Sequence, residues 1–295
     1  MENYKKIGFI NGSHIRSQMW RELYSNKFVE ADMTHTEIAK FTGNNTGNIT
    51  HRYAACNLFA EGIEFVNYQM SAEEVAEKCK MLVMPVANLL DGNDQSWIYH
   101  LLTFTRSCKI PCLLMGVGAQ SSLDLTIPKI DKDLVKFFKD FTDDGNHVTI
   151  RGEFTRRVLE HYGVTKNIHV TGCQSLFLNG HTQLGKIIKN KIDDLSDDMI
   201  YFSQFSYETE LNKVFDVLSE KSKYVMVNGC DKLMLNLKNN SMTEIEGVSL
   251  PNNILERGKI FVSPHKQAEF LRQQNAFVLT PRIHGAMISI SAELP

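Results

Sequence analysis

The feature that most constrains the fold of this chain is an alternation of short apolar runs with segments of helical periodicity. Each apolar run is bounded by Gly, Pro or Asn, which is typical of strands buried on both faces of a sheet. The expected strands cover residues 7–11, 81–87, 111–117, 147–150, 168–171, 199–203, 224–228 and 276–280. Because parallel strands need crossover helices, the alternation predicts an α/β fold with parallel sheets.

Helical segments lie between several of these runs. Ser71 and Glu74 have the spacing of a capping box, which predicts the start of a helix. Gly163 is expected to end another helix, because glycine readily adopts the left-handed conformation that closes helices. The expected helices cover residues 71–80, 132–141, 153–162, 208–221, 266–274 and 284–292.

A polar, lysine-rich stretch from about residue 179 to 198 carries no strand signal and separates two such α/β sets. We therefore predict two Rossmann-like domains, residues 1–180 and 181–295, whose parallel sheets face a cleft. A ligand is expected in that cleft, at the carboxyl ends of the strands. The second domain is expected to be incomplete at its C-terminus, because the chain ends on a helix followed by Pro295.

Charge and apolar run length exclude several classes of protein. The chain has 32 basic and 34 acidic residues, so no net field recruits nucleic acid or an anionic membrane. The apolar runs are far shorter than the roughly 18 residues of a membrane-spanning helix. The N-terminus also lacks the apolar stretch of roughly 7–15 residues that marks a signal peptide. We expect a cytoplasmic protein with no nucleic-acid partner and no integral membrane segment.

Metal and redox chemistry have little support in the sequence. The six cysteines are scattered, and we interpret them as reduced thiols that are mostly buried. The histidines form no metal-binding motif, so no metal is expected. We also expect no cofactor. Asp91 and Asp94 follow a predicted strand without an EF-hand continuation and are interpreted as part of a turn.

The first of four candidate clusters is a glycine- and asparagine-rich loop before a helical segment. Such residues tolerate positive φ, so the loop could turn its amides toward an anion or toward sugar hydroxyls. The alternative is an ordinary polar loop. The candidate binding residues are Gly43, Asn45, Thr46, Gly47 and Asn48.

The second cluster follows directly after a predicted strand and contains Gly116, Gly118 and Gln120. The two glycines permit close approach of a ligand or of another backbone segment, and the glutamine could contact a polar group. Tight packing at a turn between strand and helix is the alternative interpretation.

The third and fourth clusters lie at predicted junctions between a strand and a helix. Arg151 could bind a carboxylate or phosphate there, and a surface salt bridge is the alternative. Arg282 and His284 are two positions apart and could face the same cleft, with Gly285 beside them. A histidine titrates near neutrality and can act as an acid or base, although a lone histidine is more often structural.

Taken in order, these clusters resemble the polysaccharide pyruvyl transferase family, and the resemblance covers nearly the whole chain. Gln174 stands where that family often has proline, and Ile283 replaces its usual leucine. The matching segments are the loop 43–48, GVGAQ at 116–120, IRGEFT at 150–155, VTGCQSLF at 170–177, RIHGA at 282–286 and ELP at 293–295.

The resemblance implies a fold like that of the two-domain GT-B glycosyltransferases. It also implies phosphoenolpyruvate as the donor substrate, a hexose of a polysaccharide as the acceptor, and a cyclic pyruvate ketal as the product. Arg151 and Arg282 would hold the phosphate and carboxylate of the donor, and His284 would be the acid/base. A lipid-linked acceptor would bring the protein transiently to the inner face of the membrane.

Two other functions remain open from the sequence. A nucleotide-sugar glycosyltransferase could use the same cleft for a diphosphate, with acidic residues on the ribose. Glu293 is the acidic residue closest in sequence to Arg282 and His284. A non-catalytic carbohydrate-binding relative is the other alternative.

Overall fold

The structure, a computed structural model, contains two compact units. Unit 1 comprises Met1–Asn26 and Ala54–Gln174, and unit 2 comprises Lys27–Tyr53 and Ser175–Pro295. The residues that the structure describes are 5–10, 14–25, 27, 41–42, 45–59, 62–67, 69–92, 96–203, 217–227, 244–245, 248–249, 258–259 and 261–295.

The helices and strands alternate along most of the chain. Those up to residue 170 are β1 (Lys6–Ile10), α1 (His14–Tyr24), α3 (Gly47–Asn57), β2 (Ile63–Val66), α4 (Ala72–Lys78), β3 (Cys79–Pro85), β4 (Asn88–Leu90), α5 (Ser96–Ser107), β5 (Cys112–Ala119), α6 (Lys132–Asp143), β6 (His147–Ile150), α7 (Glu153–His161) and β7 (Ile168–Val170). Those that follow are η2 (Gln174–Phe177), α8 (Leu184–Lys191), η3 (Ile192–Asp194), β8 (Met199–Ser203), β9 (Tyr224–Val227), β10 (Glu244–Ile245), β11 (Val248–Ser249), β12 (Gly258–Lys259), α12 (Pro264–Arg272), β13 (Phe277–Leu279) and α13 (Ile283–Ser291).

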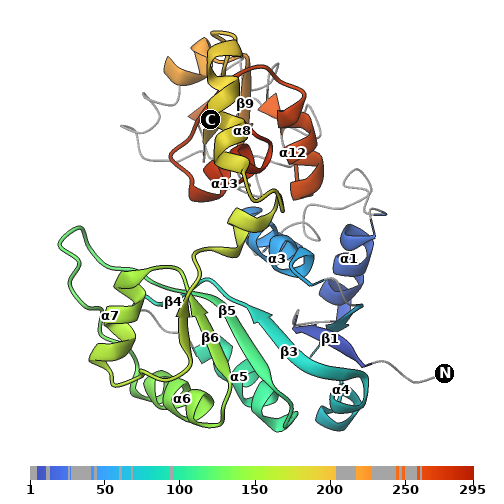
Figure 1. Ribbon diagram of the computed structural model, residues 1–295, viewed down its shortest axis with the longest axis vertical. Helices are drawn as coiled ribbons and strands as arrows, with labels where there is room; N and C mark the ends of the chain where they lie inside the picture. The colour runs from blue at the N-terminus through green and yellow to red at the C-terminus, as the bar shows by residue number, and fades with distance from the viewer. Residues whose placement is uncertain are drawn as a thin grey trace. The chain divides into compact units, whose positions relative to one another are not determined.

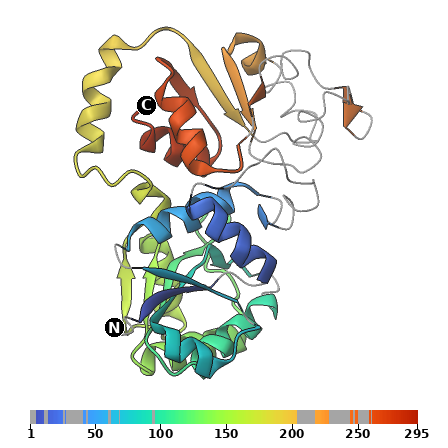
Figure 2. The same cartoon turned by 90° about the vertical axis from the view of Figure 1, so that its right-hand side faces the viewer.

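Unit 1 is built on a parallel sheet with the strand order β2-β1-β3-β5-β6-β7, and β4 pairs with β5. The chain moves from β1 to β2 in one direction and from β3 onward in the other. Right-handed crossovers therefore place α1 on one face of the sheet and α4 to α6 on the opposite face (Figures 1 and 2). Ligands of such sheets bind outside the carboxyl ends of the strands, at the point where the strand order reverses.

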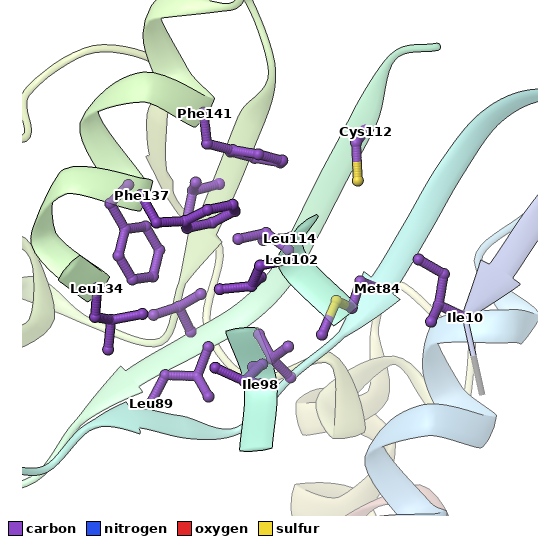
Figure 3. Packing of buried hydrophobic residues seen from close by; sticks show 14 of the residues in the cluster. Ile10, Met84, Leu89, Ile98, Leu102, Cys112, Leu114, Leu134, Phe137 and Phe141 are labelled. Carbon is purple, nitrogen blue, oxygen red and sulfur yellow. The ribbon is translucent and has the colours of Figure 1, made fainter. Parts of the chain in front are cut away.

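The core of unit 1 lies between the sheet and helices α5 and α6. Asp131 caps α6 by accepting hydrogen bonds from the N–H groups of Asp133 and Leu134. The apolar stripe of α6 faces the strands, with Leu134, Phe137 and Phe141 near Leu102 of α5 (Figure 3). This packing anchors the strands, whose carboxyl ends carry the candidate residues.

Unit 2 contains a second parallel sheet with the order β12-β9-β8-β13 in its described part. Its core joins Ile200 of β8 and Met226 of β9 to Leu271 of α12 and Ile288 of α13. Ser263 caps α12 by accepting a hydrogen bond from the Lys266 N–H. The sheet and these two helices fix the short junction between β13 and α13.

The predicted α/β class with parallel sheets is confirmed. All eight expected strands occur within about two residues of their predicted bounds, and Ser71 caps α4 as expected. The expected helix over 208–221 lies largely outside the described residues. Ten of the described elements had no prediction: α1, β2, β4, α5, η2, β10, β11, β12 and, within the polar stretch 179–198, α8 and η3. The facing of the domains across a cleft and their boundary at residue 180 stay predictions.

Candidate active site

The carboxyl end of β5 turns at two glycines whose missing side chains make room for functional groups. A Cβ on Gly116 would lie 2.0 Å from Oε1 of Gln174, and the φ of Gly116 is +83°. A Cβ on Gly118 would lie 2.8 Å from Oδ1 of Asn88 and 3.1 Å from Cδ of Arg151. The sequence predicted close approach of a ligand or of another backbone segment at these glycines, whereas the groups that approach them are side chains of the same unit.

Arg151 lies directly after β6, where its backbone N–H donates to the Val117 carbonyl of β5 at 2.9 Å. Its Nε donates to the Gly116 carbonyl at 3.0 Å, and its Nη1 donates to Oδ1 of Asn88 at 3.2 Å. The half-buried guanidinium is thus fixed at the carboxyl edge of the sheet by two neutral acceptors. Neutral acceptors leave its positive charge uncompensated.

The uncompensated charge of Arg151 distinguishes it from three other arginines of unit 1. Arg21, Arg106 and Arg156 form ion pairs with neighbouring carboxylates. Within the described residues Arg151 has no carboxylate at ion-pair distance, and its buried Nη2 has no hydrogen-bond partner. An unpartnered buried donor is costly, so Arg151 is suited to bind an anion. The alternative of a surface salt bridge finds no partner in this part of the chain.

In unit 2, Arg282 and His284 lie at the junction between β13 and α13. Arg282 is the N-terminal cap residue of α13, and its backbone N–H donates to Oγ1 of Thr280 at 3.0 Å. Its half-buried guanidinium makes no hydrogen bond or ion pair among the residues that the structure describes. Burial lowers the pKa of Arg282 from its ordinary value. Arginine nevertheless keeps its charge near neutral pH, so this group too can bind an anion.

His284 packs against the start of α3. A Cβ on Gly47 would lie 2.3 Å from Nδ1 of His284, so a glycine is needed there for the ring to take this position. The ring also stacks on the buried His51, with ring centroids 6.1 Å apart and an interplanar angle of 26°. The structure therefore brings together two predicted residues, Gly47 and His284, which are far apart in the sequence.

The glycine- and asparagine-rich loop is held by hydrogen bonds within itself. Oδ1 of Asn45 accepts from the Gly47 N–H at 2.9 Å, and Nδ2 of Asn48 donates to the Thr42 carbonyl at 3.0 Å. Thr46 is buried. Gly43, predicted as a binding residue, lies outside the described residues. The binding role of this loop stays a prediction.

The other predicted residues have different surroundings. Gln120 is exposed at the end of β5 and lines an open hollow of about 970 Å³ in unit 1. Gly285 is buried in the first turn of α13, where its carbonyl accepts from Oγ of Ser289 at 2.8 Å. That carbonyl therefore accepts a hydrogen bond within the helix, and the predicted binding role of Gly285 stays a prediction.

Metal and thiol chemistry find no support in the described residues. These residues contain no group of three or more His, Cys, Asp or Glu side chains that could hold a metal ion. Five cysteines are free and four of them are buried, with Cys173 half-buried and Cys230 outside the described part. Burial raises the pKa of Cys79 to about 11 and that of Cys112 to about 12, so both thiols are unreactive near neutral pH. No helix in the described ranges is both long enough and apolar enough to cross a membrane.

Three residues of these surroundings had no prediction as site residues: Asn88, His51 and Gln174. Asn88 is separated from Arg151 by 63 positions, and no local pattern connects them. His51 follows Gly47 by one helical turn, and this spacing was the available signal for it. Gln174 was named from the sequence only because the family often has proline at this position. Its side chain packs against Gly116, so the glutamine has a structural role here.

The candidate residues are of two chemical kinds, cationic arginines and a histidine. Arg151 and Arg282 are cations without carboxylate partners among the described residues, each at the carboxyl end of a parallel strand next to the start of a helix. His284 can exchange protons. Each arginine is suited to bind an anionic group within its own unit, and the described residues contain no cluster that could hold a metal ion.

Comparison with known proteins identifies the family. Residues 21–295 match the family described as polysaccharide pyruvyl transferase. The match spans nearly the whole chain, and the protein belongs to this family of transferases. No curated protein and no solved structure matches the chain.

Proposed function

We propose that this protein transfers the pyruvyl group of phosphoenolpyruvate to two hydroxyls of a hexose, forming a cyclic ketal. The hexose belongs to a polysaccharide or to its lipid-linked precursor, in keeping with the family to which the chain belongs. The observation that carries the proposal is the presence of two half-buried arginines, Arg151 and Arg282, that have no carboxylate partner in the described part of the chain.

The donor matches these arginines in charge. Phosphoenolpyruvate carries a phosphate and a carboxylate on a three-carbon skeleton, and a guanidinium binds either group through two parallel hydrogen bonds. In the proposal Arg151 and Arg282 hold these two groups. Asn88 and the Gly116 carbonyl orient Arg151 in advance, so less conformational entropy is lost on binding.

His284 is proposed as the acid and base. Protonation of the methylene carbon of the donor creates an oxocarbenium-like centre at the adjacent carbon. A sugar hydroxyl attacks that carbon and loses its proton, the bond to phosphate then breaks, and a second hydroxyl closes the ketal. One substrate proton thus ends on the new methyl group, and the other leaves with inorganic phosphate. A positioned histidine contributes about 10²–10⁴-fold to such proton transfers.

Calorimetric titration with phosphoenolpyruvate tests the donor assignment. We expect Arg151→Ala and Arg282→Ala each to weaken binding by about 10–100-fold, since a hydrogen bond to a charged group contributes about 1.5–3 kcal/mol. Arg156→Ala is the matched control, because this arginine is paired with Glu153 on the surface of α7 and should leave binding unchanged.

Parallel titrations with UDP- and GDP-sugars test the main alternative. Binding of a nucleotide sugar in place of phosphoenolpyruvate would assign the protein to the glycosyltransferases and contradict the proposal. Equal affinity of the wild type and both arginine variants for phosphoenolpyruvate would contradict the residue assignment instead.

A further inference from the structure

We propose that the open hollow of unit 1 is a groove that binds a saccharide chain. The identification of this chain as the acceptor rests on the proposed function. The groove has a volume of about 970 Å³ and is lined by Ala119 at the end of β5, by residues 120–122 and 125–129, by Asp91 and Gly92, and by Phe154 of α7. Ligand sites commonly have volumes of about 300–1,000 Å³, so the groove has room for more than a small monomeric ligand.

The polar lining of the groove offers mainly hydrogen-bond acceptors. The Ser121 hydroxyl donates to the Thr126 carbonyl, and the hydroxyls of Ser122 and Thr126 donate to the carboxylate of Asp124. Since these three groups use their hydrogens within the loop, their oxygens remain as acceptors. Sugar hydroxyls are the complementary donors. The exposed Gln120 amide adds both a donor and an acceptor.

The groove also has an apolar face suited to a sugar ring. The ring of Phe154 is half-buried in its wall, and the guanidinium of Arg157 lies over the ring, 5.5 Å from its centroid. The stacked guanidinium fixes the orientation of the ring. An aromatic ring held in this way can pack against the C–H face of a pyranose while the edges of the sugar bond to the polar lining.

The charge of the lining favours an uncharged glycan over an anion. Asp91 contributes one negative charge and Lys129 one positive charge, so their formal charges cancel. Arg151, by contrast, has an uncompensated positive charge within the described residues. A phosphate or carboxylate is therefore drawn to Arg151 rather than into the groove.

The lining of the groove lies close in sequence to the residues around Arg151 within unit 1. Ala119 and Gln120 directly follow Gly118, which contacts both Arg151 and Asn88. Phe154 lies three residues beyond Arg151, in the first turn of α7. This closeness along the chain is in keeping with an acceptor that must meet the donor held by Arg151.

Two substitutions test the groove. Phe154→Ala removes the aromatic wall, and Gln120→Ala removes an exposed amide whose loss leaves the core intact. Phe277→Ala is the matched control, because this partly exposed phenylalanine lies on β13 and does not line the groove. The probes are cellotetraose, maltotetraose, mannotetraose and N-acetyllactosamine, observed by saturation-transfer NMR at millimolar concentration. Titration of each variant with phosphoenolpyruvate measures donor binding independently of saccharide binding.

We expect at least one oligosaccharide to bind the wild type, with about tenfold weaker binding in Phe154→Ala and Gln120→Ala and no change in Phe277→Ala. Equal binding by all variants overturns the groove assignment, and so does the absence of binding by all four oligosaccharides. If the oligosaccharide response follows this pattern but phosphoenolpyruvate does not bind, the groove is supported and the proposed donor is wrong. If phosphoenolpyruvate binds but the groove variants retain their oligosaccharide, the donor is supported and the groove is wrong.

Discussion

The two units position their candidate charged groups in different ways. In unit 1, Arg151 is tied to a backbone carbonyl and to the Asn88 amide, and Gly118 makes room for both side chains. In unit 2, the guanidinium of Arg282 has no hydrogen-bond or ion-pair partner within the described residues. Only the backbone of Arg282 is held, by a hydrogen bond to Thr280 at the start of α13. Unit 1 therefore presents a preorganised cation, whereas unit 2 presents a cation that can adjust to a ligand.

His284 in unit 2 follows a third arrangement, in which packing against Gly47 and His51 sets the position of the ring. The largest effect on turnover is expected from His284→Ala. Loss of a general acid/base should lower kcat by about 10²–10⁴-fold while leaving the affinity for phosphoenolpyruvate nearly unchanged. Steady-state kinetics together with calorimetry measure the two quantities. His265→Ala, an exposed histidine of α12, is the control, and wild-type turnover in His284→Ala would refute the acid/base role.

The preorganisation of Arg151 can be broken at Asn88. Asn88→Asp places a carboxylate where Oδ1 lies 3.2 Å from Nη1 of Arg151, so an internal ion pair would compete with the donor. We expect affinity for phosphoenolpyruvate to fall by about 10–100-fold, against about 2–10-fold for Asn88→Ala, which removes one hydrogen bond. Calorimetry measures both. A smaller loss in Asn88→Asp than in Asn88→Ala would show that Arg151 is not the anion-binding group.

The glycines allow a sharper test of the same contrast. Gly116→Ala and Gly47→Ala should each destabilise the fold by about 1–3 kcal/mol, because the new Cβ collides with Gln174 or with His284. Adding Gln174→Ala to Gly116→Ala should recover only part of the loss, since the positive φ still costs roughly 1–2 kcal/mol.

Adding His284→Ala to Gly47→Ala should recover most of the loss, because the φ of Gly47 is not in the left-handed region and the remaining close contact, at 2.9 Å, is with the side-chain oxygen of Asn45. Urea unfolding of the single and double variants gives the free energies. Full recovery in both pairs would mean that the two glycines serve the same purpose.

The smallest expected effect concerns the loop of unit 1 that carries Asp124. Hydrogen bonds from the hydroxyls of Ser122 and Thr126 lower the pKa of Asp124 to about 2. Because the folded-state pKa lies below that of the unfolded chain, the contribution of these bonds is present above about pH 4 and is lost as the pH falls toward 2. NMR titration of the Asp124 carboxyl carbon measures the shift, with Asp124→Asn as the variant in which the loop loses its pH dependence. An ordinary pKa would show that the loop is not held by these bonds.

Much of the fold could be predicted because its signals are local. Apolar runs bounded by glycine and proline gave all eight expected strands, and the serine cap located α4. Short elements such as β4 escaped prediction, because three residues carry too little periodicity to distinguish a strand from a loop. The helix α8 is only eight residues long, and its apolar residues, Leu184, Ile187 and Ile188, are only half-buried within a polar stretch, so its periodic signal is weak.

The sequence by itself determined which residues could carry chemistry: Arg151, Arg282 and His284 each follow a strand at a junction where polar groups are commonly functional. Only the tertiary structure decided how they are held. Asn88 meets Arg151, Gln174 fills the space above Gly116, and Gly47 admits the ring of His284, each across a long separation in sequence. Helical and strand periodicity arise from neighbouring residues, whereas these contacts arise only when crossover connections bring distant segments to the carboxyl ends of the strands.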